Sequence, residues 1–534
     1  MTDADNEIVR QVRDRVAAEE TLNDPGGDPG DGKPSSKLIN DCMFANVHGD
    51  GSLFAWLFRE KFVYNKNKKE WFVWNGQYWE HDIMGLTLGA VEDLVTCYLD
   101  EYRKISEKIT KLVESGETDS ADGAEKEKGY KVKQAALLKR ARQLRDEKRR
   151  NGCLNFSHTL KEGSLGINGR EFDRDPWLLA CANGVINLKT GDLEDGRPGD
   201  YISMASPIEW QGIDAPADLW EKTLLEIFAG DEEIVAYLQR LFGYCITGIV
   251  TEKVFPILLG KSGWNGRSLI MDTFNYVMGP LVCGIPSEML LSSRNIKSSS
   301  GPSPDIMILK GRRLVFASET DDGHKFNAAI VKKLTGKDEL QGRNPNDKYF
   351  TFFDPTHKLI LMTNTPPAAP SHDKAFWERV HLINFPISFV NREPQDDTER
   401  RAILNLDTQV KKEAPGILAW LVRGCLLWQK YGIDPPKQVT EATMRYRRNE
   451  DILADYIEEC CLREAGAKEE AGKLYARFVR WYHDNIGKKE PTGTTFGKML
   501  SHKFDKSKSG GRNIYHGICL ADGQEAIPDE GREG

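Results

Sequence analysis

The sequence predicts an α/β core built on a parallel sheet, preceded by an α+β domain and followed by a winged-helix-like domain. Short apolar runs recur with helix-length segments between them, as the buried strands of a parallel sheet do. A glycine-rich loop, an acid and an asparagine follow the first three runs, at strand ends where such folds place ligand-binding residues. The runs cover residues 254–259, 313–318, 358–362 and 380–385.

The first run leads into a loop that reads L-G-K-S-G-W-N-G-R-S-L-I, from Leu259 to Ile270. Such loops bind a triphosphate because glycines turn backbone N–H groups toward the anion, the next helix adds its dipole, and a Ser hydroxyl can ligate Mg²⁺. There are two departures: Arg267 replaces the usual Lys, and Gly260 stands one residue too far upstream. A plain Gly/Asn turn between strand and helix is the alternative.

The following runs end in polar residues that suit nucleotide chemistry. Glu319 follows residues 313–318 and can hold Mg²⁺ or orient water, and Asn364 can sense a γ-phosphate. Arg379 precedes the fourth run and is a candidate arginine finger. Taken singly, each has a simpler explanation as a turn or cap residue. Their order along the chain favours a nucleotide site.

The chain carries the glycine-rich loop and four further motifs, S-E-T-D-D-G, L-T-G-K-D-E-L-Q-G-R, L-M-T-N-T-P-P and W-E-R-V. On these motifs, the chain resembles a superfamily 3 AAA+ helicase of the phage and plasmid primase-helicase branch. Asn265 before Gly266 is typical of that branch. The segment 173–193 is similar to the block that precedes the helicase in those proteins.

The resemblance implies ATP and Mg²⁺ as cofactors. The residues that would cradle the phosphates are Gly263, Trp264, Asn265, Gly266, Arg267 and Ser268. Ser268 and Glu319 would hold Mg²⁺, with Glu319 as the Walker B acid. Asn364 would be sensor 1, and Arg379 would act in trans across a subunit interface.

Arg267 is not a conservative replacement, because a planar guanidinium keeps the charge of Lys but not its shape. If the loop is otherwise normal, nucleotide binding should survive this replacement better than nucleotide hydrolysis. The extra loop residue could instead widen the cradle enough for a guanidinium. We expect ATP binding and hydrolysis, and leave open whether Arg267 slows turnover.

Residues 339–343 and 348–353 predict two short strands around the turn sequence N-P-N-D. In the family this hairpin faces a central channel and grips one DNA strand. Arg343 and Lys348 would then contact phosphates. A solvated surface hairpin with incidental charges is the competing explanation.

The length of 534 residues predicts about three domains. We expect a disordered segment at 1–36, a helicase-associated domain at 37–206, a helical collar and ATPase core at 207–440, and a winged-helix-like domain at 441–534. No stretch approaches the ~20 apolar residues of a membrane span, and the ten cysteines show no metal-site spacing. We therefore expect a cytoplasmic protein with no membrane partner.

The net charge of −8 does not exclude DNA binding, because local charge decides it. Residues 473–512 are basic with interleaved aromatics, and predict two helices followed by a hairpin at 506–519. The aromatics should form its core. DNA contacts by this domain are an open alternative to surface charge alone, and the residues that would make them are Lys498, Lys503, Lys506, Lys508 and Arg512.

The N-terminal part predicts strands at 62–64, 71–74 and 77–80, then helices at 86–105 and 129–149 joined by a loop at 114–123. The second helix is basic and could touch DNA or be a solvated face. No strand-borne D-x-D or D-x-E pair is recognisable, since 192–195 resembles a turn. We therefore expect no primase in this chain.

Two function classes remain. The first is an ATP-dependent replicative helicase of a phage, plasmid or other mobile element. We expect it to form a ring, a hexamer, that moves on single-stranded and forked DNA and works beside a separate primase or replication initiator. The second is a nucleotide-dependent DNA-binding or origin-recognition scaffold that does not unwind. A metabolic P-loop kinase would leave the hairpin, Asn364 and Arg379 unexplained.

Overall fold

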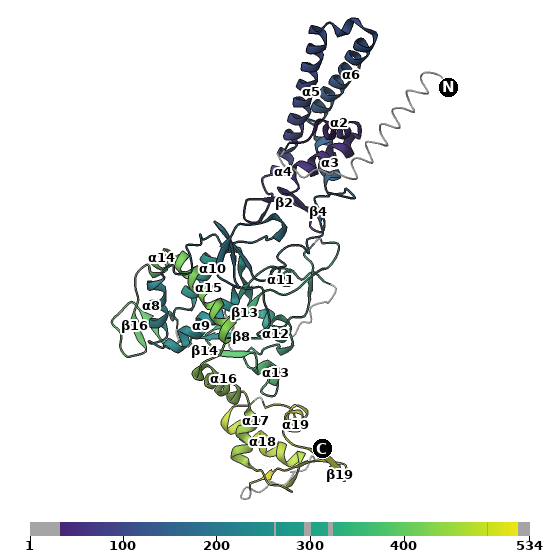
Figure 1. Ribbon diagram of the computed structural model, residues 1–534. Helices are drawn as coiled ribbons and strands as arrows, with labels where there is room; N and C mark the ends of the chain where they lie inside the picture. Colours follow the sequence, from purple (N-terminus) through teal and green to yellow (C-terminus); the bar gives the residue numbers. More distant parts are fainter. Residues whose placement is uncertain are drawn as a thin grey trace. The chain divides into compact units, whose positions relative to one another are not determined.

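The computed structural model describes residues 33–260, 263–292, 301–318, 324–345, 347–488 and 490–521 (Figure 1). The chain divides into two compact units, residues 1–212 and 213–534. The expected disordered segment lies almost wholly outside the described residues, and the first described helix begins at Ser36. Each unit is described by itself.

The first unit has a helical part and two small sheets. Its helices are α2 (Ser36–Phe44), α3 (Asn46–Phe58), α4 (Leu86–Gly89), α5 (Val91–Glu114), α6 (Ala121–Gln143) and α7 (Glu147–Ser157). The long helices α5 and α6 pack side by side as a helical hairpin (Figure 1). Both differ from the prediction: α5 runs to Glu114, and α6 already starts at residue 121, because Ser120 caps it by accepting from the Gly123 N–H.

A buried ion cluster joins α3, α6 and α7. The Asp50 carboxylate is fully buried, and it accepts from Arg140 Nη1 at 2.8 Å and Arg149 Nε at 2.8 Å. Tyr98 of α5 donates to the same carboxylate at 3.1 Å. Since these arginines hold the helices together, part of the basic charge predicted near 129–149 has a structural role.

The sheets of the first unit are mostly antiparallel. The first has the order β3-β2-β1-β4, with the strands β1 (Phe62–Asn65), β2 (Glu70–Trp74), β3 (Trp79–His81) and β4 (Gly166–Ile167). The second contains β5 (Leu178–Cys181), β6 (Gly184–Asn187) and β7 (Asp192–Glu194). The predicted first two strands are confirmed, and the third begins two residues later than expected.

The second unit is centred on a five-stranded parallel sheet in the order β14-β8-β13-β10-β9. Its strands are β8 (Phe255–Leu259), β9 (Val282–Pro286), β10 (Leu314–Ser318), β13 (Lys358–Thr363) and β14 (Val380–Asn384). Every residue of β8 and β13 is buried, which explains why both are recognisable as apolar runs. The four predicted strands are confirmed. The edge strand β9 was missed, because its sequence V-C-G-I-P is short and interrupted by Gly and Pro.

Helices surround this sheet, and two β-strand pairs are appended to it. The longer helices are α8 (Asp218–Ile227), α9 (Glu232–Cys245), α10 (Arg267–Met278), α15 (Ala414–Tyr431) and α16 (Lys437–Asn449). The shorter ones are α11 (Pro304–Met307), α12 (Ala328–Leu334), α13 (Lys374–Trp377) and α14 (Leu406–Lys411). The appended pairs are β11 (Leu340–Gly342) with β12 (Thr351–Phe353), and β15 (Ser388–Val390) with β16 (Glu399–Arg401).

The C-terminal part of the second unit has its own hydrophobic core. Its elements are α17 (Ile452–Cys460), β17 (Cys461–Leu462), β18 (Lys468–Glu470), α18 (Ala471–Asn485), α19 (Gly493–Ser501), β19 (Lys506–Ser509), β20 (Arg512–His516) and β21 (Cys519–Leu520). The predicted order of two helices and a hairpin is present in α18, α19 and β19–β20. Phe478, Trp481 and Phe496 are buried together, so their expected packing role is confirmed.

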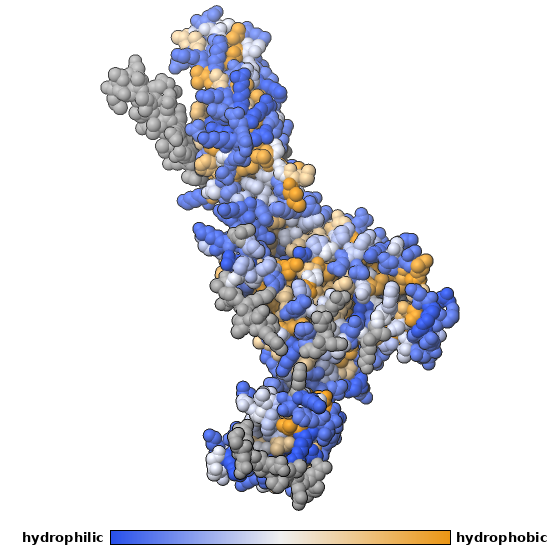
Figure 2. Space-filling model, turned by 180° about the vertical axis from the view of Figure 1, so that it is seen from behind, coloured by the Kyte–Doolittle hydropathy of each residue, from blue (hydrophilic) through white to orange (hydrophobic). Residues whose placement is uncertain are grey.

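The face of the molecule seen in Figure 2 carries many polar side chains. In Figure 2 the surface of the α5–α6 hairpin is mostly hydrophilic, with a few hydrophobic side chains between the polar ones. Among the helices formed by the described residues, none has the length and apolar character needed to cross a bilayer.

Candidate nucleotide-binding site

The carboxyl ends of three neighbouring strands bring the sequence motifs to one edge of the parallel sheet. Thr363 at the end of β13 pairs with Leu259 at the end of β8, and the Gly260 N–H donates to the Thr363 carbonyl at 3.2 Å. On the other side of β13, Met362 pairs with Ser318 at the end of β10. The segments that follow these strands therefore start at the same edge.

The phosphate loop is shaped by two glycines and a buried asparagine. A Cβ on Gly260 would lie 1.8 Å from Asn265 Nδ2, so only Gly allows Asn265 to fold under the loop. Gly266 has φ 88° and precedes α10, a left-handed conformation that favours Gly. Gly263 has open space around its Cα, and Trp264 is 79% exposed. Lys261 and Ser262 lie outside the described residues.

Arg267, the first residue of α10, lies across the edge of the sheet. Its Nε donates to Asn265 Oδ1 at 2.9 Å, and its Nη2 donates to Asn364 Oδ1 at 2.5 Å. Its Nη1 donates to the carbonyls of Leu258, at 3.3 Å, and Thr363. Partial burial lowers the pKa of the guanidinium from its ordinary value. The planar fork thus joins the phosphate loop to the predicted sensor, a set of bonds that a Lys ammonium could not make.

These residues fit a nucleotide triphosphate with its magnesium ion. The open backbone at Gly263, the N-terminus of α10 and the Arg267 cation all favour an anion at this edge. Ser268 is exposed on the first turn of α10, where a hydroxyl can reach a metal bound to phosphates. Glu319, the predicted acid, lies outside the described residues, one position after Ser318.

Arg379 lies at the opposite edge of the sheet. It precedes β14, whose first residue Val380 pairs with Phe255, the first residue of β8. Arg379 is level with residue 254, so six residue steps along the strand direction separate it from Gly260, a distance of about 20 Å. Its Nη1 donates to the Ala375 carbonyl, and its buried Nε has no hydrogen-bond partner among the described residues. Arg379 is therefore not brought to the phosphate loop of its own chain.

The predicted hairpin is present as β11 and β12, although its strands are shorter than expected because β11 ends at Gly342 and β12 begins at Thr351. Arg343 Nη1 donates to the Asp347 carbonyl at 3.2 Å, and its guanidinium lies over the Phe350 ring at 5.6 Å. Lys348 lies over the Tyr349 ring at 5.4 Å, and that ring is 72% exposed. Tyr349 and Phe350 therefore place two exposed rings beside these cations, a feature that the charge pattern alone did not indicate. The signal for it was the sequence K-Y-F after the turn.

The predicted basic residues near the C-terminus have different surroundings. Lys503 pairs with Asp451 at 2.6 Å and Arg512 with Glu470 at 2.9 Å. Lys506 lies 6.0 Å from the centre of the Tyr515 ring. Lys498 on α19 and Lys508 on β19 are exposed.

One expectation about the first unit is wrong. Asp192 and Glu194 are on strand β7, so a strand-borne D-x-E pair does exist. The turn ends at Gly191, so the expected turn residues 192–194 are strand instead. Glu194 is already bonded to Asn187 at 3.0 Å and to Arg197 at 3.3 Å. Within the described part of the chain, no three His, Cys, Asp or Glu side chains are grouped to hold a metal ion.

Comparison with known proteins agrees with these features. Residues 51–229 match the family model described as "D5 N terminal like". The protein named "Putative helicase L207/L206" of Acanthamoeba polyphaga mimivirus is 27% identical over 348 residues, which are 63% of this chain and 36% of that protein. "Putative helicase 022R" of Frog virus 3 is 23% identical over 397 residues, 61% of this chain and 40% of that protein.

These similarities support the resemblance to superfamily 3 primase-helicases of phages and viruses that the sequence motifs indicate. The names of these relatives support, at a coarse level, a helicase or NTPase. The chain spans little more than a third of the length of the viral relatives that it matches. The solved apo C-terminal region of NrS-1 matches at 11% identity with a TM-score of 0.37, over 58% of this chain and 76% of that one, a level that supports no functional argument.

Proposed function

We propose that this protein is an ATP-dependent DNA helicase that acts as a homo-oligomeric ring, a hexamer, on single-stranded and forked DNA during replication of a phage, plasmid or virus. The observation that carries the proposal is the contact of Arg267 with Asn265 and Asn364. It joins a phosphate loop to a γ-phosphate sensor across two neighbouring parallel strands, an arrangement suited to detecting hydrolysis.

Each residue has a defined part in this proposal. The loop backbone and Arg267 bind the β- and γ-phosphates, and Ser268 and Glu319 hold Mg²⁺. When bound, Mg²⁺ neutralises charge that develops between the phosphates. Asn364 positions the attacking water or the γ-phosphate. Arg379 faces away from its own loop, which supports a role at the nucleotide of a neighbouring subunit.

The hairpin supplies the coupling to DNA. Arg343 and Lys348 contact phosphates, and the exposed Tyr349 ring stacks on a base. Both strands of the hairpin lie between β10 and β13 in the chain, so it is connected to the two strands that lead to the Walker B segment and to Asn364.

The test combines ATP turnover with strand displacement on a forked DNA. The unaltered protein should separate the strands in ATP and Mg²⁺, and Glu319→Gln should bind ATP without separating them. Glu288→Gln, which removes an exposed carboxylate elsewhere in the same unit, is the matched control and should behave as the unaltered protein. Displacement that persists in Glu319→Gln, or a chain that does not bind ATP, contradicts the proposal.

A second function is favoured by one observation. The hydrogen bond from Arg267 occupies the side-chain amide oxygen of Asn364, the residue that would otherwise sense the γ-phosphate. If this bond persists with nucleotide present, ATP would lock the ring on DNA without powering movement, as in an origin-recognition scaffold. Oligomers that form with ATP and bind DNA, but displace no strand, identify this scaffold.

A further inference from the structure

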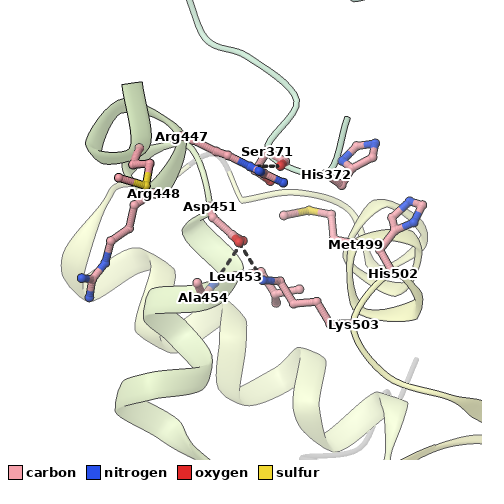
Figure 3. A pocket seen from close by; sticks show the side chains of 11 residues that line it. Ser371, His372, Arg447, Arg448, Asp451, Leu453, Ala454, Met499, His502 and Lys503 are labelled. Carbon is pink, nitrogen blue, oxygen red and sulfur yellow. Dashed lines mark hydrogen bonds and ion pairs between the residues drawn. The ribbon is translucent and has the colours of Figure 1, made fainter. Parts of the chain in front are cut away.

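A basic cavity of about 510 Å³ lies within the second unit, away from the phosphate loop (Figure 3). Three parts of the chain enclose it: the loop before α13, the junction of α16 with α17, and the end of α19. Its volume is within the range of small-ligand sites. The lining residues are Ser371, His372, Met444, Arg447, Arg448, Asp451, Leu453, Ala454, Met499, His502 and Lys503.

The lining has an excess of positive charge. The lining contains the cations Arg447, Arg448 and Lys503 and a single carboxylate, that of Asp451. Both Asp451 oxygens are engaged, one by the Ala454 N–H at 3.2 Å and the other by Lys503 Nζ at 2.6 Å. An anion that enters the cavity therefore meets cations and a carboxylate that is already neutralised locally.

Arg447 is held in an orientation suited to a ligand. Its Nε donates to the Ser371 carbonyl at 3.1 Å, so one edge of the guanidinium is fixed on the loop. Its two Nη groups make no other hydrogen bond with the described residues. In Figure 3 this guanidinium points across the mouth of the cavity toward Ser371 and His372. Arg448 points away and pairs with Glu458 at 3.3 Å, with both side chains about 70% exposed, which makes it a weak pair.

A flat ring surface lies beside these cations. The His372 and His502 rings are stacked, with centroids 4.5 Å apart and planes 10° from parallel. Met499 and the exposed Met444 add polarizable thioethers on the same lining. Rings and thioethers next to cations suit a planar base attached to a phosphate, the chemistry of single-stranded nucleic acid.

We propose that this cavity binds one nucleotide unit of a DNA single strand, with its phosphate on Arg447 and Lys503 and its base against His502 and Met499. The proposal rests on the proposed action on DNA, but not on ATP turnover. It adds a second strand contact, separate from the β11–β12 hairpin. A free nucleotide shares the same phosphate and base chemistry, and the experiment separates the two sources.

The experiment measures fluorescence anisotropy of a labelled oligothymidylate with the full chain and no ATP. Arg447→Ala should weaken binding by about tenfold, the size expected for one charge-assisted contact. It should also lower the slope of log affinity against log salt by about 0.7, the value for one phosphate of a single strand. Arg445→Ala is the matched control, because it removes the same charge from an exposed position of α16 outside the cavity.

Three outcomes overturn the proposal. The first is equal binding by Arg447→Ala and Arg445→Ala. The second is a result in which Arg447→Ala weakens the binding of thymidine monophosphate, measured by calorimetry, but leaves oligothymidylate binding unchanged. That result would assign the cavity to a free nucleotide. The third uses the unaltered protein: an oligonucleotide carrying 5-iododeoxyuridine should photo-crosslink to the peptide of Met499 and His502, and crosslinks confined to other peptides contradict the site. Because the crosslinking measurement needs no variant and no ATP, it can support or contradict the cavity site even if the protein does not unwind DNA.

Discussion

Replacing Arg267 by Lys tests whether the guanidinium restrains the sensor. In the structure its Nη2 lies 2.5 Å from Asn364 Oδ1. A hydrogen bond to a charged group contributes about 1.5 to 3 kcal/mol, and the exposure of Asn364 favours the lower value. About 1.4 kcal/mol corresponds to a factor of ten. Lys keeps the charge but cannot span Asn265 and Asn364 together, so kcat for ATP hydrolysis should rise about tenfold.

The assay is steady-state phosphate release, with and without single-stranded DNA, over a range of ATP concentrations. Because the charge at the phosphates is kept, KM for ATP should change little in Arg267→Lys. Arg267→Met removes the charge as well and should weaken ATP binding. An Arg267→Lys protein that binds ATP normally but turns over no faster than the unaltered protein would refute the idea that the Arg267–Asn364 bond limits hydrolysis.

Three further predictions concern stability, pH and DNA. Asp50→Ala leaves the buried Arg140 and the partly buried Arg149 without their carboxylate and should lower the free energy of unfolding by about 3–5 kcal/mol in urea denaturation, whereas Glu92→Gln, at an exposed pair, should cost under about 1 kcal/mol. Burial lowers the pKa of His381 to about 4, so the unfolded chain takes up a proton on this residue first, and His381 should contribute a loss of about 3 kcal/mol in stability as the pH drops from about 6.5 to 4. His381→Gln should reduce the acid-induced loss by that amount, whereas the loss due to buried His357, whose pKa is also about 4, should remain. Tyr349→Ala should weaken binding of single-stranded DNA about tenfold, through lost base stacking. Tyr431→Ala removes another exposed tyrosine, outside the hairpin, and should have no effect; equal losses in both variants would argue against the hairpin contact.

The sequence was most informative where burial and chemistry coincide. The strands that carry the phosphate loop and Asn364 are continuous apolar runs because both faces of the sheet are covered, and their ends are marked by Gly or Pro. The edge strand β9 has no such pattern, since packing on β10 rather than its own composition holds it in place. The turn expected at 192–195 became β7 for the same reason: pairing with β6 overrides the local preference of its residues.

The candidate site was predicted as a set of residues but not as a set of contacts. Motif order identified Arg267 and Asn364, yet spacing along the chain could not show that the guanidinium reaches the amide directly. The cavity around Arg447 and His502 was also beyond prediction, because its walls come from segments far apart in the sequence. The same holds for Asp50, whose partners are about a hundred residues away.

The position of Arg379 has a consequence for how activity depends on dilution. Since β8 and β14 run parallel from Phe255 and Val380, one chain cannot fold its arginine back onto its own nucleotide without breaking the sheet. Under the proposed function, a solitary chain is an incomplete catalyst. Specific activity should then climb steeply with protein concentration and level off once the chains are associated, so that assembly itself becomes the control on when energy is released.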